Sequence, residues 1–496
     1  MTAKPNLLFI MSDQHAPRVT GCYGDKIVRT PNLDKLAERG VTFDNAYSPS
    51  PLCVPARMSL LTGRHPSSQE CWTNSDPLAS DIPTTSHSLG AAGYRPRLVG
   101  RLHSIGPDQM HGYAERRVGD HSTNWIGGVA HSLGVLSDTQ GPFQLSLERA
   151  GGGQSSYEVH DRDVTAEALT MIDELAAICE TGEEAAFSLN VGFMLPHQPY
   201  VADPDLVHDY LERIDDPRWP QPATEEDHPY LLWWREKTGI DVPVDRRKIR
   251  NARAAYYALV ETFDTMVGKV LDRLEVTGLA DNTLIIYTSD HGDQIGERGL
   301  WWKQTFYDDS IKVPLILSWP GVLPKNERRD QIVNLIDLAP TMLEAMGAPA
   351  LPEIDGRSFW TVAKDPTANW KNETFAEYCV DGMAAWASGL TSQQRMIRAG
   401  KWKLIYYSGH RPQLFDLDED PGEIRDLAES PEHAAVREKL TVRVLENWNP
   451  ADIDAVMATR RRRKEILSKW SHETKPPDTH RWQIKMEDNW LSEPPV

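Results

Sequence analysis

The chain has 496 residues, of which 40% are hydrophobic and 25% charged, a composition typical of a globular protein with a large buried core. Its net charge of −19 at pH 7 argues against a nucleic-acid partner, because such proteins neutralise phosphates with Lys and Arg. The five cysteines include no Cys-x-x-Cys pair, which excludes a disulfide framework and a zinc ribbon.

The first strongly apolar stretch runs only from Leu7 to Met11, which is shorter than a signal peptide requires. Nowhere does the chain carry the apolar run of about 18 residues that a membrane-spanning helix needs. The sequence therefore predicts a cytoplasmic protein with no membrane partner.

Predicted strands and helices alternate along the first 365 residues. The strand pattern occurs at Asn6–Met11, from Val41, at Ala186–Val191 and at Thr283–Thr288, and helices are expected after Thr30 and over Ile249–Leu274. This alternation is typical of an α/β fold, in which helices sandwich a large, mostly parallel mixed sheet.

The sequence changes character after about residue 365. Segments 395–398 and 401–407 flank an Ala-Gly pair and predict a β-hairpin, followed by a short strand and a helix. We expect three parts: a large domain over residues 1–365, a smaller α+β domain over 366–450, and a tail over 451–496 at a subunit interface. The basic run in the tail, 460–464, is expected to be a solvated helix face.

The most specific motif is the segment 51–64, which reads Pro-Leu-Cys-Val-Pro-Ala-Arg-Met-Ser-Leu-Leu-Thr-Gly-Arg. Pro55 sets the backbone for the start of a short helix, so Cys53 is expected near a helix N-terminus, where free N–H groups favour an anion. Arg57 can hold an oxyanion through two hydrogen bonds.

Polar side chains follow two of the predicted strands. Asp13 and Gln14 end the first strand, and Asp290 and His291 end the strand that begins at Thr283. Both pairs are expected at the carboxyl edge of one sheet, where α/β enzymes build their sites. A set of mostly oxygen ligands favours Ca²⁺, Mg²⁺ or Mn²⁺, and the imidazole ligand favours Mn²⁺ among these three.

The segment 51–64 resembles the signature of type I sulfatases, which belong to the alkaline phosphatase superfamily. In that family the cysteine is oxidised to formylglycine by a formylglycine-generating enzyme, and the hydrated aldehyde is the nucleophile. The resemblance implies that residues 1–365 are the catalytic domain and that Cys53 and Arg57 are catalytic. It also implies a divalent metal, Ca²⁺ first with Mn²⁺ or Mg²⁺ as alternatives, held by Asp13, Gln14, Cys53, Asp290 and His291.

Three further segments continue the resemblance. Gly93–His103 is similar to a second sulfatase signature, with Pro96 in place of a hydroxyl residue and Arg101 in place of the usual lysine. By resemblance, Arg101 contacts the sulfate and His103 hydrogen-bonds the nucleophile. The segments 195–200 and 296–303 supply His197 as general acid and Lys303 as a ligand of the sulfate and the leaving oxygen.

The implied reaction is hydrolysis of a sulfate ester. One hydroxyl of the formylglycine hydrate attacks sulfur, and His197 and Lys303 assist departure of the alcohol. His103 then takes the proton that lets the second hydroxyl expel sulfate.

Segments 79–84, 106–113 and 296–303 look like those of choline sulfatases and their relatives, which bind a quaternary ammonium with aromatic and acidic groups. The expected substrate pocket comprises Trp72, Asn74, Trp125, Trp301 and Glu377. Arg101, Ser104 and the end of the tail depart from the choline pattern. They favour a carbohydrate or other small organic sulfate ester as substrate, with choline sulfate as the alternative. Related enzymes often assemble through their tails, which implies a homo-oligomer.

Two rival functions remain open. Phosphonate monoester and phosphodiester hydrolases share the formylglycine and the metal site, and the segment 106–113 favours a sulfatase over them. A non-catalytic binding protein on the same fold is disfavoured by the intact set of catalytic residue types.

Overall fold

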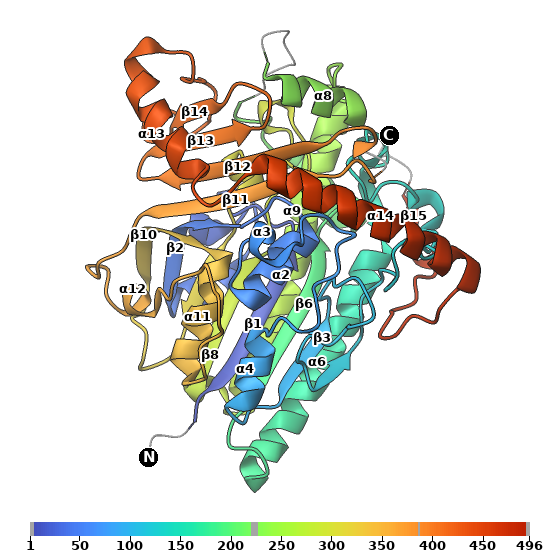
Figure 1. Cartoon of the computed structure of the whole chain (residues 1–496). Helices are drawn as coiled ribbons and strands as arrows, with labels where there is room; N and C mark the ends of the chain where they lie inside the picture. The colour runs from blue at the N-terminus through green and yellow to red at the C-terminus, as the bar shows by residue number, and fades with distance from the viewer. Residues whose placement is uncertain (1–3, 220–226, 385–386, 493–496) are drawn as a thin grey trace.

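The computed structural model describes residues 4–219, 227–384 and 387–492. Its centre is an eight-stranded sheet with the strand order β10-β2-β9-β8-β1-β6-β3-β4 (Figure 1). These strands are β1 (Asn6–Asp13), β2 (Val41–Tyr47), β3 (Pro96–Gly100), β4 (Glu115–Arg117), β6 (Ser188–Pro196), β8 (Thr283–Ser289), β9 (Leu315–Ser318) and β10 (Glu327–Asn334). Only β9 runs antiparallel to its neighbours, so the predicted mostly parallel sheet is confirmed.

Both faces of this sheet are buried. Leu8 and Ile10 of β1 belong to one apolar core, and Leu7 and Phe9 belong to the other. Side chains alternate across a strand, so a strand that is covered on both faces reads as a continuous apolar run. Helices α6 (Ser156–Thr181) and α9 (Arg246–Val276) contribute to the first core, and α2 (Cys53–Thr62), α4 (Thr85–Ala91) and α11 (Leu335–Met346) contribute to the second.

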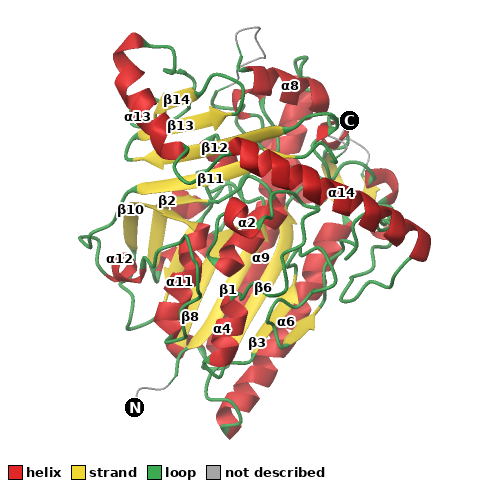
Figure 2. Cartoon of the chain, viewed as in Figure 1, coloured by secondary structure: helices red, strands yellow, loops and turns green. Residues whose placement is uncertain are grey.

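A second, antiparallel sheet lies beyond one edge of the large sheet, next to β10 (Figure 2). Its strands are β11 (Glu373–Val380), β12 (Ser392–Ala399), β13 (Trp402–Tyr407) and β14 (Gln413–Asp416), and α13 (Ala434–Val444) packs on it. The predicted hairpin is present as β12 and β13. A small third sheet joins β15 (Trp490–Leu491), β5 (Gly151–Gln154) and β7 (Val201–Ala202).

The remaining helices are short, apart from α14 near the C-terminus. They are α1 (Pro31–Glu38), α3 (Pro66–Gln69), α5 (Leu145–Glu148), α7 (Pro204–Arg213), α8 (Pro229–Thr238), α10 (Asp308–Ile311), α12 (Trp360–Lys364) and α14 (Pro450–Thr474). Among the described residues, no helix combines the length and the apolar character needed to cross a membrane.

The basic run of α14 is only in part the solvated face that was predicted, because Arg462 and Arg463 are exposed but Lys464 is buried. Lys464 is only 3% exposed, and its Nζ lies 2.9 Å from Asp76 and 2.5 Å from Asp381. Arg460 also pairs with Asp76 and Glu70. Lys464 and Arg460 thus tie α14 to a loop of the large sheet's domain and to the end of β11, and these partners are distant in sequence. The last residues of the tail, 493–496, lie outside the described residues.

Candidate active site

The site forms where β1 and β8 end side by side. Ser12 pairs with Ser289 in parallel register, so the residues that follow, Asp13 and Asp290, are brought together at the carboxyl edge of the sheet. The backbone N–H of Gln14 donates to Asp290 Oδ1 at 3.0 Å. These side chains are fully buried, as is that of His291, which follows Asp290.

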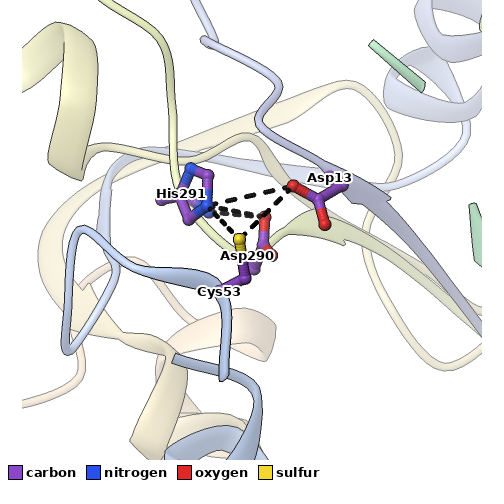
Figure 3. Close-up of side chains that lie close together, drawn as sticks. All are labelled: Asp13, Cys53, Asp290 and His291. Atoms are coloured by element: carbon purple, nitrogen blue, oxygen red, sulfur yellow. Dashed lines mark hydrogen bonds and ion pairs between the residues drawn. The ribbon is translucent and has the colours of Figure 1, made fainter. Parts of the chain in front are cut away.

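Cys53 is the first residue of α2, so its side chain lies at the N-terminus of a helix, as predicted. Its Sγ lies 3.1 Å from His291 Nε2 and 3.8 Å from Asp13 Oδ1. Figure 3 shows Asp13, Cys53, Asp290 and His291 converging, with one ligand atom from each within 4.8 Å of the others. Sequence reasoning had grouped these four residues, and the structure brings them together.

The imidazole of His291 is oriented as a metal ligand would be. Its Nδ1 faces the Gly292 carbonyl at 3.1 Å, so Nδ1 carries the proton and the Nε2 lone pair points into the cluster. Burial lowers the pKa of His291 to about 4, which keeps the ring neutral.

Two arginines face the cluster of carboxylates. Arg57 Nε lies 2.8 Å from Asp290 Oδ2, and its Nη2 lies 3.1 Å from Asp13 Oδ2. Arg101 Nε lies 2.7 Å from the same Asp13 oxygen. Burial alone would raise the pKa of Asp13, but the positive charges of Arg101, Arg57 and Lys303 lower it well below its ordinary value. Asp13 is therefore a carboxylate, ready to bind a cation.

The guanidinium of Arg101 bonds in three directions. Besides Asp13, it donates to Asp120 Oδ1 at 2.9 Å and to His103 Nδ1 at 2.7 Å. An arginine only donates, so Nδ1 of His103 accepts and the proton of the neutral ring sits on Nε2. Burial, followed by the charge of Arg101, lowers the pKa of His103 well below its ordinary value. A lysine at position 101 has a single ammonium and cannot reproduce this fork.

Lys303 links three of the predicted residues. Its Nζ lies 2.8 Å from Gln14 Oε1, 3.1 Å from Cys53 Sγ and 3.0 Å from His197 Nε2. His197 Nδ1 faces the Gln198 carbonyl at 2.6 Å, so Nδ1 carries the proton and Nε2 accepts from Lys303. Burial, followed by the charge of Lys303, lowers the pKa of His197 well below its ordinary value.

Sequence reasoning missed the residues that orient the Gln14 amide. Its Nε2 donates to Asp293 Oδ2 and to Gln198 Oε1, both at 2.6 Å, which leaves Oε1 to accept from Lys303. Asp293 lies in the same loop as Asp290 and His291, so its place in the sequence could have predicted that it belongs to the site. Asp120 had no comparable signal, because it belongs to a loop with no recognised motif.

The five predicted pocket residues lie in different surroundings. Asn74 is next to the site, since its Oδ1 accepts from the backbone N–H of Val54 at 3.0 Å. Trp301 and Trp72 are buried in apolar clusters, at 1% and 2% exposure. Trp125 packs edge-on against Trp470 of α14. The carboxylate of Glu377 is bound by Ser67 and lies beside Arg395.

Comparison with known proteins identifies the family. A family model described as Sulfatase matches residues 5–348. The chain belongs to the sulfatase family. A second model, N-sulphoglucosamine sulphohydrolase C-terminal, matches residues 296–449 of this sulfatase.

Curated relatives are similar in sequence to this sulfatase along most of its length. It is 32% identical over 487 residues to the choline-sulfatase of Rhizobium meliloti (strain 1021), with 94% of this chain and 91% of that protein covered. It is 28% identical to arylsulfatase K of Rattus norvegicus, with 86% and 76% covered. These relationships make the protein a sulfuric ester hydrolase, as the sequence motifs predicted.

Solved structures share the fold. A phosphonate monoester hydrolase from Silicibacter pomeroyi matches with a TM-score of 0.73 and 24% identity, over 90% of this chain and 95% of that one. A protein in complex with its substrate D-glucosamine-2-N,6-O-disulfate matches with a TM-score of 0.69 and 20% identity, over 90% and 98%. At this identity the likeness concerns the fold, which is the α/β architecture predicted.

Proposed function

We propose that this sulfatase cleaves the O-sulfate ester of a carbohydrate or another small organic molecule, with a formylglycine made from Cys53 as its nucleophile. The supporting observation is the convergence of Lys303 and His291 on Cys53 Sγ, which we take as the position of the reacting oxygen. Lys303 Nζ and His291 Nε2 each lie 3.1 Å from it. When formed, the formylglycine hydrate would supply a hydroxyl nucleophile at this point.

The unmodified thiol is a poor nucleophile in this setting. Burial raises the pKa of Cys53 to about 11, and the charge of Asp13 acts in the same direction. A thiol with that pKa is almost wholly protonated near neutral pH, whereas a nucleophilic cysteine needs its thiolate. Oxidation by a formylglycine-generating enzyme would remove this barrier.

The donor set fits a divalent cation. Asp13, Gln14 and Asp290 offer oxygens, and neutral His291 offers one nitrogen beside residue 53. The oxygen majority favours Ca²⁺, with Mn²⁺ or Mg²⁺ as alternatives. A bound cation would supply Lewis acidity and offset the negative charge of the sulfate. Arg57 would hold Asp13 and Asp290 in place for it through the contacts described above.

Lys303 and His197 are placed to serve the leaving oxygen as a pair. His197 directs its Nδ1 proton at the Gln198 carbonyl, so its Nε2 holds none in the resting state. The proton available there is on Lys303 Nζ, 3.0 Å from Nε2. We assign the general-acid role to this pair, with Lys303 also binding the sulfate.

Arg101 modifies the role expected of His103. With Nδ1 accepting from Arg101, the ring presents its Nε2 proton and acts as a hydrogen-bond donor. The base role implied by family resemblance needs the other tautomer, and hence release of the Arg101 contact. We therefore propose that His103 orients the nucleophile by donating a hydrogen bond, and that Arg101 holds its tautomer.

The alternatives for the alcohol come from the relatives. The curated relatives are named choline-sulfatase and arylsulfatase K, and one structural neighbour is bound to a sulfated glucosamine. Choline sulfate is therefore the second candidate substrate, and a phosphonate monoester or phosphodiester is the third. Trp72, Asn74, Trp125, Trp301 and Glu377 stay predictions as substrate-binding residues.

The division into a catalytic domain (1–365), a smaller domain (366–450) and a tail (451–496) stays a prediction, as do the homo-oligomer and the cytoplasmic location. The oligomeric state can be measured by light scattering on the full chain.

The substrate proposal is tested by sulfate release. The enzyme is made in a host with aldehyde-forming activity, loaded with metal, and assayed on sulfated sugars, choline sulfate, and matched aryl sulfate and aryl phosphonate esters. The highest kcat/KM on a sugar or other uncharged organic sulfate supports the proposal. A higher kcat/KM on choline sulfate or on the aryl phosphonate overturns it in favour of that alternative.

A further inference from the structure

The end of the chain packs along the outer side of a loop that borders the active site. The backbone N–H of Asp120 donates to the His480 carbonyl at 3.0 Å, and the N–H of Trp482 donates to the Asp120 carbonyl at 2.9 Å. The approach is so close at Gly119 that a Cβ there would lie 1.4 Å from the His480 carbonyl oxygen. Only a glycine permits this contact.

Side chains reinforce the contact between tail and loop. Asp478 Oδ1 accepts from the backbone N–H of Asn124 at 2.9 Å and from Thr123 Oγ1 at 3.1 Å. Arg481 Nε donates to the His121 carbonyl at 3.1 Å. The tail is thereby bound to its own chain through both backbone and charged groups.

The inner side of the same loop holds proposed catalytic residues. The carboxylate of Asp120, which is 3% exposed, accepts from Arg101 Nη1 at 2.9 Å and from the backbone N–H of His103 at 2.8 Å. The backbone of Asp120 therefore bonds to the tail, and its side chain bonds to residues of the active site.

A second line of contacts leads from the tail to His197. The Trp482 ring packs edge-on against His160, with centroids 5.4 Å apart. His160 Nδ1 bonds to Asp161 at 2.9 Å, and its Nε2 bonds to the Gly119 carbonyl at 3.0 Å. Asp161 in turn accepts from the backbone N–H groups of residues 194 and 195, which begin the turn that carries His197.

We propose that the segment 478–482 is a positioning element for the active site. It fixes Asp120 and Asp161, two buried carboxylates that hold the loops bearing the catalytic histidines. The proposal rests on the proposed function of those histidines. The tail acts through other residues and touches none of the reacting atoms.

The most direct perturbation is Gly119→Ala in the full-length enzyme. The added Cβ displaces the His480 strand, while the side chains of the catalytic residues stay unchanged. Gly90→Ala in α4 is the matched control, because nothing lies within 4 Å of a Cβ at that position. We expect hydrogen exchange in Gly119→Ala to rise both in residues 478–482 and at the His103 amide. We also expect kcat to fall by about tenfold or more, the scale of losses from slight misplacement.

A second pair of variants tests the proposal independently if Gly119→Ala fails to fold. Trp482→Ala removes the ring from His160, whereas Trp482→Phe keeps an aromatic contact. Recovery of kcat in Trp482→Phe but not in Trp482→Ala supports positioning, provided that both variants unfold at the wild-type temperature.

Faster exchange in the tail with wild-type kcat and wild-type exchange at His103 overturns the proposal. The exchange readout needs no turnover. If the wild-type enzyme and the Gly90→Ala control release no sulfate, the proposed function fails, but the coupling of the tail to His103 can still be measured.

Discussion

Replacement of Asp293 by Asn tests how the metal site is built. The Asp293 carboxylate accepts from four donors: the Gln14 and Tyr200 side chains on Oδ2, and the backbone N–H groups of residues 295 and 302 on Oδ1. An Asn has a single oxygen, which the two backbone donors occupy. Its amide nitrogen then faces Gln14 Nε2, donor against donor, and the favourable response is for the Gln14 amide to rotate.

The rotation has a calculable effect on metal binding. It turns the Gln14 amide nitrogen, in place of Oε1, towards Lys303 and the cation site. A hydrogen bond to a charged group contributes about 1.5–3 kcal/mol, which corresponds to a roughly 10- to 100-fold weaker Kd for the cation. The fold is expected to tolerate the change, because burial raises the pKa of Asp293 and so already disfavours its charged form.

The Kd is measured by calorimetric titration of Ca²⁺ or Mn²⁺ into chelator-treated protein, with Asp330→Asn, an exposed aspartate of β10, as the control. We expect weaker binding in Asp293→Asn alone, with unfolding temperatures alike in the metal-free proteins. A Kd equal to that of the control would refute the assignment of Gln14 as an oriented ligand.

Three further predictions concern the nucleophile, the tail and pH. Cys53→Ala should abolish sulfate release while metal-free stability is retained; turnover near the wild-type rate would reject the nucleophile. Lys464→Ala removes the cation that pairs with buried Asp381 and one of the two cations that pair with buried Asp76, and should lower the free energy of unfolding in urea by about 3–5 kcal/mol, against no change for the exposed Lys469→Ala. Burial raises the pKa of Asp337 to about 6 from its ordinary 3.8, so its contribution to stability is complete below pH 3.8 and lost as pH rises through 6. The stability of wild type relative to Asp337→Asn should therefore fall by about 2 kcal/mol from pH 4 to pH 7, and a constant difference would contradict this.

The parts of the site that could be predicted from sequence follow local rules. Asp13 and Asp290 each end an apolar strand, and adjacent parallel strands bring such residues to one edge. Cys53 comes two residues before a proline that suits the first turn of a helix, so its position at the start of α2 could also be predicted. The hairpin of β12 and β13 followed in the same way from its Ala-Gly turn.

The parts that could not be predicted depend on contacts between distant segments. Lys464 looked solvated because its partners, Asp76 and Asp381, lie far from it in sequence. Asp120 belongs to an irregular loop, and its importance appears only once Arg101 and the tail are seen on its two sides. The orientation of Arg101 could not be predicted either, because a sequence gives the charge of the side chain but not the direction of its guanidinium.

The central claim is that residue 53 works as a formylglycine in sulfate ester hydrolysis. The direct measurement is mass spectrometry of the peptide containing residue 53, on preparations with different extents of modification, together with kcat for sulfate release on each. We predict an aldehyde in place of the thiol and a turnover rate proportional to the aldehyde fraction. Full turnover by protein that carries only the unmodified Cys53 thiol would contradict the account.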